Sequence, residues 1–110
     1  MIDNQELRVA DVIWNYFSAV RSKWPVAWDN LGRGAVLGKT NGFRALMRFL
    51  RPAYLRLARP GGVPSMQDFL GIFDRVTLRN EDFNIDNFVP GTSGEGALYR
   101  RLREDTGLQA

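Results

Sequence analysis

Apolar side chains recur every three or four residues in several stretches of this chain, and this spacing constrains the fold most strongly. The clearest stretch is 6–23, where the apolar positions are Val9, Val12, Ile13, Tyr16, Phe17 and Val20. A period near 3.6 residues places such side chains on one face of an α-helix. Similar spacing begins near Asn41, Ser65 and Ser93. The sequence therefore predicts a mainly α-helical bundle of four to five helices joined by glycine-rich loops.

Proline marks the end of the first predicted helix. Pro25 disfavours helical geometry at Trp24, so we expect the helix to stop there and Trp24 and Trp28 to fold back onto the core. The alternative is that these tryptophans form an aromatic platform for a base or a sugar. A loop with a short strand is expected over 29–39.

Later boundaries also follow from local signals. Pro52 is expected to break or kink the second helix, with a short helical segment restarting there. Ser65 and Asp68 fit a capping box that starts a helix running to about Leu78. The stretch 79–90 fits either an extended segment or a helical turn.

Two twelve-residue segments, Thr40–Arg51 and Thr92–Arg103, share the frame T-x-G-x-x-A-L-x-R-x-L-R. Each predicts a capped helix start with free backbone N–H groups beside guanidinium groups, a combination that suits phosphate. In the second copy Glu95 completes a capping box with Thr92, and Gly107 supplies a helix stop. Because leucine, arginine and alanine are ordinary helix formers, the alternative is that the copies are helix starts and nothing more.

Charge is distributed unevenly along the chain. No acidic residue occurs over 30–67, which holds seven of the fifteen cations, while all twelve acids lie outside it. The two regions could attract each other, or the basic one could face an external polyanion. If the basic region faces an external polyanion, the residues predicted to bind nucleic acid or phosphate are Lys39, Thr40, Asn41, Gly42, Arg44, Arg48, Thr92, Ser93, Gly94, Arg100 and Arg101. The last two could instead pair with Glu104 and Asp105 along the helix surface.

Several function classes are disfavoured by what the chain lacks. It has no histidine and no cysteine, so the usual general base, thiolate ligands and disulfides are missing. A nucleotide-binding P-loop would need glycine at position 33, where Arg33 stands before Gly38 and Lys39. The carboxylates and amides over 80–87 suit a hard cation but lack the EF-hand frame, and a solvated loop or a partner for the arginines is the alternative. We expect no enzyme activity, cofactor or metal.

Size and hydropathy suggest a single domain over 1–110. No apolar run approaches the roughly 20 residues that span a bilayer, so we expect no membrane partner. The first residues are too polar and acidic for a signal peptide, and the default expectation is a cytoplasmic protein.

Four blocks together resemble the C-terminal part of DGQHR-domain proteins. They are Arg8–Phe17, the Trp24–Asp29 corner, Leu37–Leu46 and Phe88–Gly96. These bacterial proteins, often encoded near mobile or DNA-modification loci, are similar to the regulator of the DNA phosphorothioation system. The resemblance implies a role tied to DNA and a possible place as a C-terminal domain in a larger architecture. The signature that names the family is absent, since the chain has no histidine.

These patterns predict a non-catalytic helical domain that binds nucleic acid, DNA rather than RNA, or supports such binding. The alternative is a protein interaction module or homo-oligomer, in which an aromatic stripe of Trp14, Tyr16 and Phe17 meets a partner.

Overall fold

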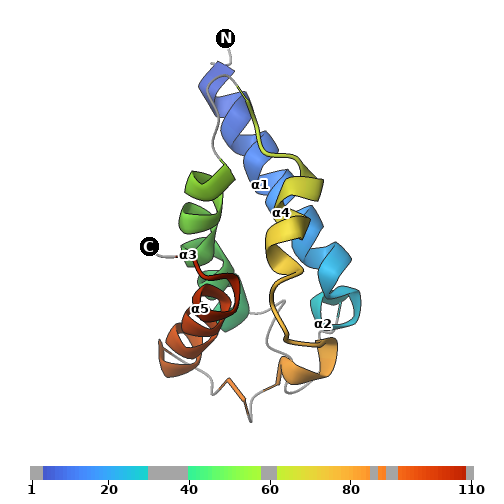
Figure 1. The fold of residues 1–110 in the computed structure, drawn as a ribbon, viewed down its shortest axis with the longest axis vertical. Coiled ribbons are helices and arrows are strands. Elements are labelled where there is room, and N and C mark those ends of the chain that lie inside the picture. Colours follow the sequence, from blue (N-terminus) through green and yellow to red (C-terminus); the bar gives the residue numbers. More distant parts are fainter. Residues whose placement is uncertain (1–3, 30–39, 58–61, 85–86, 89–91, 109–110) are drawn as a thin grey trace.

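The described part of the chain folds mainly as α-helices (Figure 1). The computed structural model describes residues 4–29, 40–57, 62–84, 87–88 and 92–108, and at 4–8, 40–41 and 92 the backbone alone. The helices are α1 (Asn4–Lys23), α2 (Pro25–Asp29), α3 (Thr40–Leu57), α4 (Met66–Phe73) and α5 (Thr92–Thr106), with a 3-10 turn η1 (Asn80–Asp82). The prediction of a mainly α-helical bundle is confirmed for this part of the chain.

Two helix pairs make the body of the fold. α1 packs on α4 and α3 packs on α5, and Figure 1 shows the two pairs side by side. Phe73 of α4 lies between them: its ring centre is 5.4 Å from that of Tyr16 in α1 and 5.9 Å from that of Phe49 in α3. All three rings are fully buried. Aromatic contacts of this kind stabilise a core beyond the area that they bury.

The corner between α1 and α2 places one tryptophan in the core. Trp24 interrupts the helix as predicted, and Pro25 begins α2, where its missing N–H removes no helical hydrogen bond. The Trp24 ring is 1% exposed and its Nε1 donates to the Leu78 carbonyl at 2.8 Å. Trp28 is half-buried. Trp24 is therefore core and offers no platform for a base.

Helix α3 continues through its proline. Pro52 lies inside the helix, so the expectation of a separate segment restarting there is wrong. Phe49 and Ala53, on either side of the proline, are both fully buried. Burial of these side chains in one helical register offsets the roughly 3 kcal/mol that an internal proline costs.

Helix α4 begins as predicted and ends early. Ser65 and Asp68 form the capping box, with Ser65 Oγ accepting from the Asp68 N–H at 3.1 Å. The helix stops at Phe73 and does not reach Leu78. Beyond the turn at 74–75, buried Val76 and Leu78 alternate with exposed Thr77, the two-residue period of extended chain. This alternation buries both apolar side chains where a continued helix would not.

Some of the remaining predictions are confirmed, and others fall on residues that the structure does not describe. Within 79–90, η1 is followed by Phe83 and Phe88, both buried. The end of α5 at Gly107 is confirmed by a φ of 72°, which glycine adopts readily. The expected loop and strand before Lys39 and the side-chain cap from Thr92 lie outside the described residues. No helix in the described part of the chain is long and apolar enough to span a bilayer.

Candidate nucleic-acid interface

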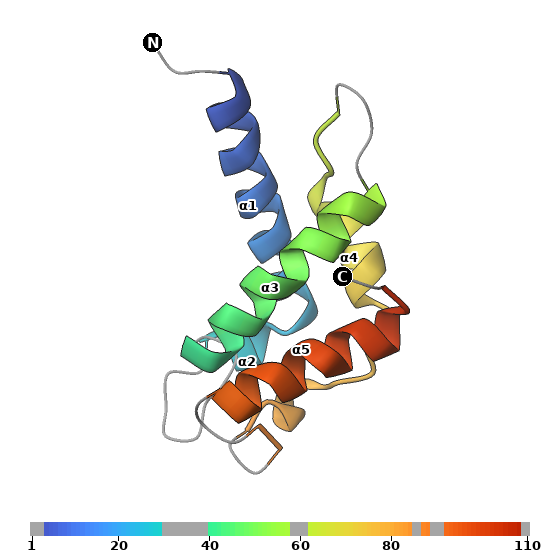
Figure 2. The ribbon, with the colours of Figure 1, turned by 90° about the vertical axis from the view of Figure 1, so that its left-hand side faces the viewer.

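The two copies of the repeated frame lie next to each other. α3 and α5 pack side by side and run in the same direction, so that both helix starts lie at one end of the pair (Figure 1, Figure 2). The contact between them joins the ninth residue of α3, Arg48, to the eighth of α5, Tyr99. The parallel arrangement places the basic residues of both copies on neighbouring helices.

Most of the shared frame serves packing. Its buried positions are Gly42, Ala45 and Leu46 in α3 and Gly94, Leu98 and Leu102 in α5. Small residues in the first turn and leucines along one face let two helices approach closely. Gly42 and Gly94, which the sequence assigned to phosphate, are both buried in the first turn of their helices.

Two of the arginines lie against the ring of Tyr99. The Arg48 guanidinium carbon lies 4.2 Å from the centre of the Tyr99 ring, and that of Arg103 lies 5.5 Å from it. Tyr99 itself is 8% exposed, so its ring is fixed by packing. Each guanidinium is within the roughly 6 Å over which a cation is attracted to an aromatic ring. The ring holds two positive groups, one from each copy of the frame, at the junction of the helices.

Three more arginines complete a basic surface. Arg44 and Arg51 of α3 and Arg100 of α5 are exposed. We call the set Arg44, Arg48, Arg51, Arg100 and Arg103 the arginine surface. Within the described part of the chain, none of the five has an ion pair; the cations that do are Arg21, Lys23, Arg79 and Arg101.

The acidic stretch over 80–87 was a candidate partner for the five arginines of the arginine surface. Among the described residues the two do not meet. The Glu81 carboxylate lies 3.7 Å from Arg79 beside it, and Asp82 accepts the Arg79 N–H at 2.8 Å. Asn84 Oδ1 accepts the Asn87 N–H at 3.0 Å. The described part of the stretch bonds within itself and to α2, where Asn80 Oδ1 accepts the Ala27 N–H at 2.9 Å, and none of its described carboxylates pairs with the arginine surface.

Arg101 belongs to a different part of α5. Its Nε donates to Asp105 at 3.0 Å and one of its terminal nitrogens donates to the Thr77 hydroxyl at 2.8 Å. Asp105 also accepts the N–H and the hydroxyl of Thr77, each at 3.1 Å. The predicted pairing of Arg101 with Asp105 is confirmed, whereas Arg100 and Glu104 form no ion pair in the described structure. Arg101 thus ties α5 to the extended segment after α4.

These bonds also change the titration of the carboxylate. Burial raises the pKa of Asp105, but the hydrogen bonds from Thr77 and Arg101 and the charge of Arg101 together lower that pKa below its ordinary value. The carboxylate is therefore held in its charged form by its partners.

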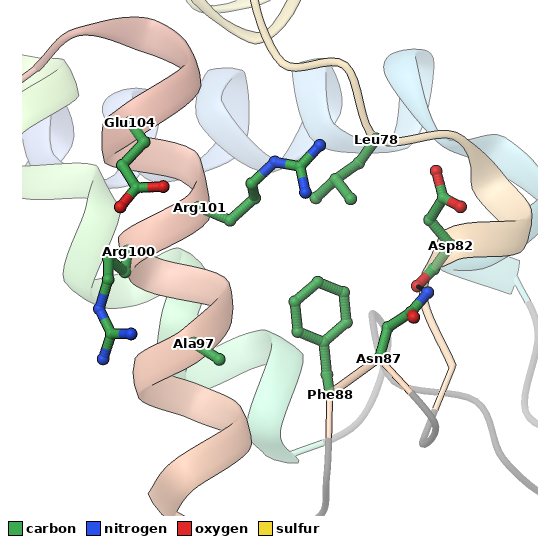
Figure 3. Close-up of a pocket in the computed structure, with 8 residues that line it drawn as sticks. All are labelled: Leu78, Asp82, Asn87, Phe88, Ala97, Arg100, Arg101 and Glu104. Carbon is green, nitrogen blue, oxygen red and sulfur yellow. Dashed lines mark hydrogen bonds between the residues drawn. The ribbon is translucent and has the colours of Figure 1, made fainter.

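A cavity of about 480 Å³ opens beside Arg101 (Figure 3). Leu78, Phe88 and Ala97 form the apolar part of its lining, and Arg101 reaches across it from α5 towards Leu78. The opposite wall is locally bonded, since the Asn87 amide donates to the Asp82 carbonyl at 2.9 Å. Arg100 and Glu104 border the cavity on α5, where their side chains point away from Phe88.

The remaining predicted site residues are placed only in part. Ser93 is exposed at the start of α5. Helices α3 and α5 begin at Thr40 and Thr92, one residue before the predicted starts near Asn41 and Ser93. The side chains of Thr40, Asn41 and Thr92, like all of Lys39, lie outside the described residues.

The predicted site residues did not include Arg51 or Arg103, although both belong to the basic faces that the sequence indicates, and they did not include the Tyr99 ring between the two helices. Arg51 and Arg103 occupy equivalent positions of the repeated frame, which was the available signal. Nothing in the sequence paired Arg48 with Tyr99, because that contact depends on how the helices pack.

Comparison with protein-family models, with curated proteins and with solved structures gives no match for this chain. The resemblance to DGQHR-domain proteins stays a prediction.

Proposed function

We propose that this domain binds nucleic acid, DNA in the first place, through the arginine surface. The observation that carries the proposal is that five arginines, on two neighbouring parallel helices, have no acidic partner in the described structure. Guanidinium groups bind phosphate oxygens in a planar, bidentate geometry. Phosphate contacts of this kind supply most of the affinity of non-specific binding. No step in the proposal requires a cofactor or a reaction.

The parallel helix starts support the same proposal. Figures 1 and 2 show the N-termini of α3 and α5 at the same end of the pair, and the first turn of a helix carries backbone N–H groups without intrahelical partners. Together with Lys39 and Ser93 near those starts, they would extend the phosphate-binding surface beyond the arginines. The end of the pair would then contact the backbone of the same nucleic acid.

The experiment is a salt titration. Binding of a fluorescent DNA is followed by anisotropy between about 50 and 200 mM salt, where phosphate contacts make the affinity fall steeply. Arg48→Gln and Arg100→Gln should each weaken binding and reduce the slope of log affinity against log salt by about 1. Arg79→Gln is the matched control, because Arg79 is exposed, already paired with Glu81, and lies at the start of η1, outside the two helices that carry the arginine surface. Binding that ignores salt, or that Arg79→Gln weakens equally, would contradict the proposal.

One observation favours a second function, that of a protein interaction or oligomerisation module. Of the predicted stripe on α1, Trp14 is 75% exposed and lines an apolar hollow with Phe17 and Ile13. The expectation that Tyr16 also meets a partner is wrong, because Tyr16 is fully buried in the core. Exposed apolar surface such as that around Trp14 marks interaction sites. Sedimentation in high salt tests it: a dimer that persists there, in a protein without affinity for nucleic acid, would favour this second function.

The link to DGQHR-domain proteins and a bacterial cytoplasmic setting belong to the proposal as well. They rest on the sequence blocks and on composition. A role beside DNA agrees with binding through the arginine surface.

A further inference from the structure

The outer face of α3 has an unusual composition. The exposed side chains that the structure describes on this helix are Arg44, Arg48, Arg51 and Arg56 together with Phe43, Met47, Tyr54 and Leu55. All eight are either arginine or large and apolar. The outward face of a helix in water ordinarily carries charges of both signs and uncharged polar groups. A face built of cations and apolar groups is suited to a ligand that is itself both anionic and flat or apolar.

Phe43 ends a stack of rings at the surface. Its ring lies 5.5 Å from that of Phe17 with only 8° between the planes, and Phe17 lies 5.8 Å from Trp28. Although Phe17 contacts it, Phe43 is 48% exposed. The stack is held by two helices and the corner of α1 and α2, so the outer ring is fixed in position. A nucleobase could extend it without any rearrangement of the protein.

The aromatic and basic side chains run along the helix together. Tyr54 follows Phe43 by eleven residues, about three helical turns, and therefore lies on the same side of α3 with Met47 between them. Arg44, Arg48 and Arg51 form the neighbouring line. A line of cations beside a line of exposed rings matches the two parts of an unpaired strand, its phosphates and its bases. A duplex presents phosphates but keeps its base faces stacked inside.

We propose that the nucleic acid bound here is single-stranded, with its phosphates on the arginine surface and bases stacked on Phe43 and Tyr54. This inference rests on the proposed function and names its substrate class. Base stacking on aromatic side chains is tolerant of sequence and is common to proteins that bind unpaired DNA or RNA. The inference therefore covers unpaired DNA and unpaired RNA, and the experiment distinguishes between these two ligands.

The experiment compares one protein with three ligands at the same low salt: a 20-nucleotide DNA strand, the RNA of the same sequence, and the DNA duplex. At least one single strand should bind about fivefold or more tightly than the duplex. Phe43→Leu and Tyr54→Leu should each weaken single-strand binding about five- to tenfold, in line with the loss of one stacked base. Their duplex binding should be unchanged. Leu55→Ala is the matched control, since Leu55 is exposed on the same face but has no ring.

Because Phe43 contacts Phe17, the folding of the Phe43→Leu variant is checked by circular dichroism at the temperature of the assay. Tyr54→Leu is a second variant whose substituted residue is not part of this stack. A duplex that binds as tightly as both single strands overturns the inference while leaving the proposed function intact. So does unchanged single-strand affinity in both ring variants, or an equal loss with Leu55→Ala. If no nucleic acid binds near 50 mM salt, the proposed function itself has failed.

Discussion

The guanidinium of Arg48 in α3 lies over the ring of Tyr99 in α5, 4.2 Å from its centre. These two residues come from different copies of the repeated frame and join the helices that carry it. The contact orients one arginine of the proposed surface, while Tyr99 itself is only 8% exposed. Stability and binding are therefore coupled at this position.

Replacing Tyr99 should separate the role of the ring from that of the hydroxyl. Tyr99→Phe keeps a ring under both guanidinium groups, and we expect the free energy of unfolding to change by less than about 0.5 kcal/mol. Tyr99→Leu removes the ring and its cation contacts and should cost about 1–2 kcal/mol, with weaker DNA binding. Urea denaturation and anisotropy measure the two effects. An Arg48→Gln, Tyr99→Leu double-mutant cycle with no coupling would show that the contact contributes nothing.

Tyr16→Phe should destabilise the fold by about 1 kcal/mol, the usual contribution of a hydrogen bond. The Tyr16 hydroxyl donates to the Leu46 carbonyl at 2.6 Å, joining α1 to α3, and the ring is fully buried. Because Leu46 lies within α3, its carbonyl keeps the helical N–H as a donor. The cost should therefore be at the low end for a buried group. A loss above about 3 kcal/mol in urea denaturation would show that the ring also moves.

Tyr16 should also make the protein sensitive to alkali. Burial raises the pKa of its hydroxyl well above 10 in the folded state. A raised pKa contributes stability that is fully present below the unfolded value of about 10 and is lost as pH rises above it. Unfolding free energies measured between pH 8 and pH 11 should fall for the native chain and less steeply for Tyr16→Phe. Parallel curves would rule out Tyr16 as the source.

Asp105→Asn should change the response to acid. The pKa of Asp105 is lowered in the folded state, despite burial, by its bonds to Thr77 and Arg101. A lowered pKa contributes stability that is present above the unfolded value of about 3.9 and is lost as pH falls through the folded value. Stability of the variant should be lower by about 1–2 kcal/mol at pH 7 and should fall less below pH 4. Thermal melts across pH 2.5–7 measure both, and an unchanged acid limb would contradict the assignment.

Ser65→Ala should weaken α4 at its first turn. The serine oxygen accepts the Asp68 N–H at 3.1 Å, and the Asp68 carboxylate accepts the Ser65 N–H at 3.0 Å. Loss of a capping side chain costs about 1 kcal/mol. Since α4 carries the buried Phe69 and Phe73, the loss should appear in global unfolding measured by urea. Ser65→Asp, which keeps a capping oxygen, should restore most of it.

Local signals in the sequence were sufficient for much of the secondary structure. The period of apolar residues gave α1, and Ser65 with Asp68 gave the start of α4. Gly107 gave the end of α5 because a positive φ favours glycine. These features depend on residues within one or two turns of each other, where propensity and capping dominate.

Two boundaries were wrong for the same physical reason. The helix through Pro52 and the extended chain at 76–78 both run against local preference or period. In each case burial of neighbouring side chains, Ala53 in one and Val76 and Leu78 in the other, outweighs the local term. Tertiary packing decides such positions, and a single sequence does not show which side chains will be covered.

The sequence alone determined that the chain is helical, that an acid-free basic stretch precedes residue 68, and that two arginine-bearing helix starts share one frame. Only the tertiary structure decided that these helices lie parallel and adjacent, that Tyr99 holds an arginine from each, and that Arg101 turns away to Asp105. The physical reason is the distance along the chain between the residues that determine each feature. Helix periodicity and charge are local properties of the chain, whereas the direction and neighbours of a helix follow from the burial of aromatic side chains contributed by distant segments.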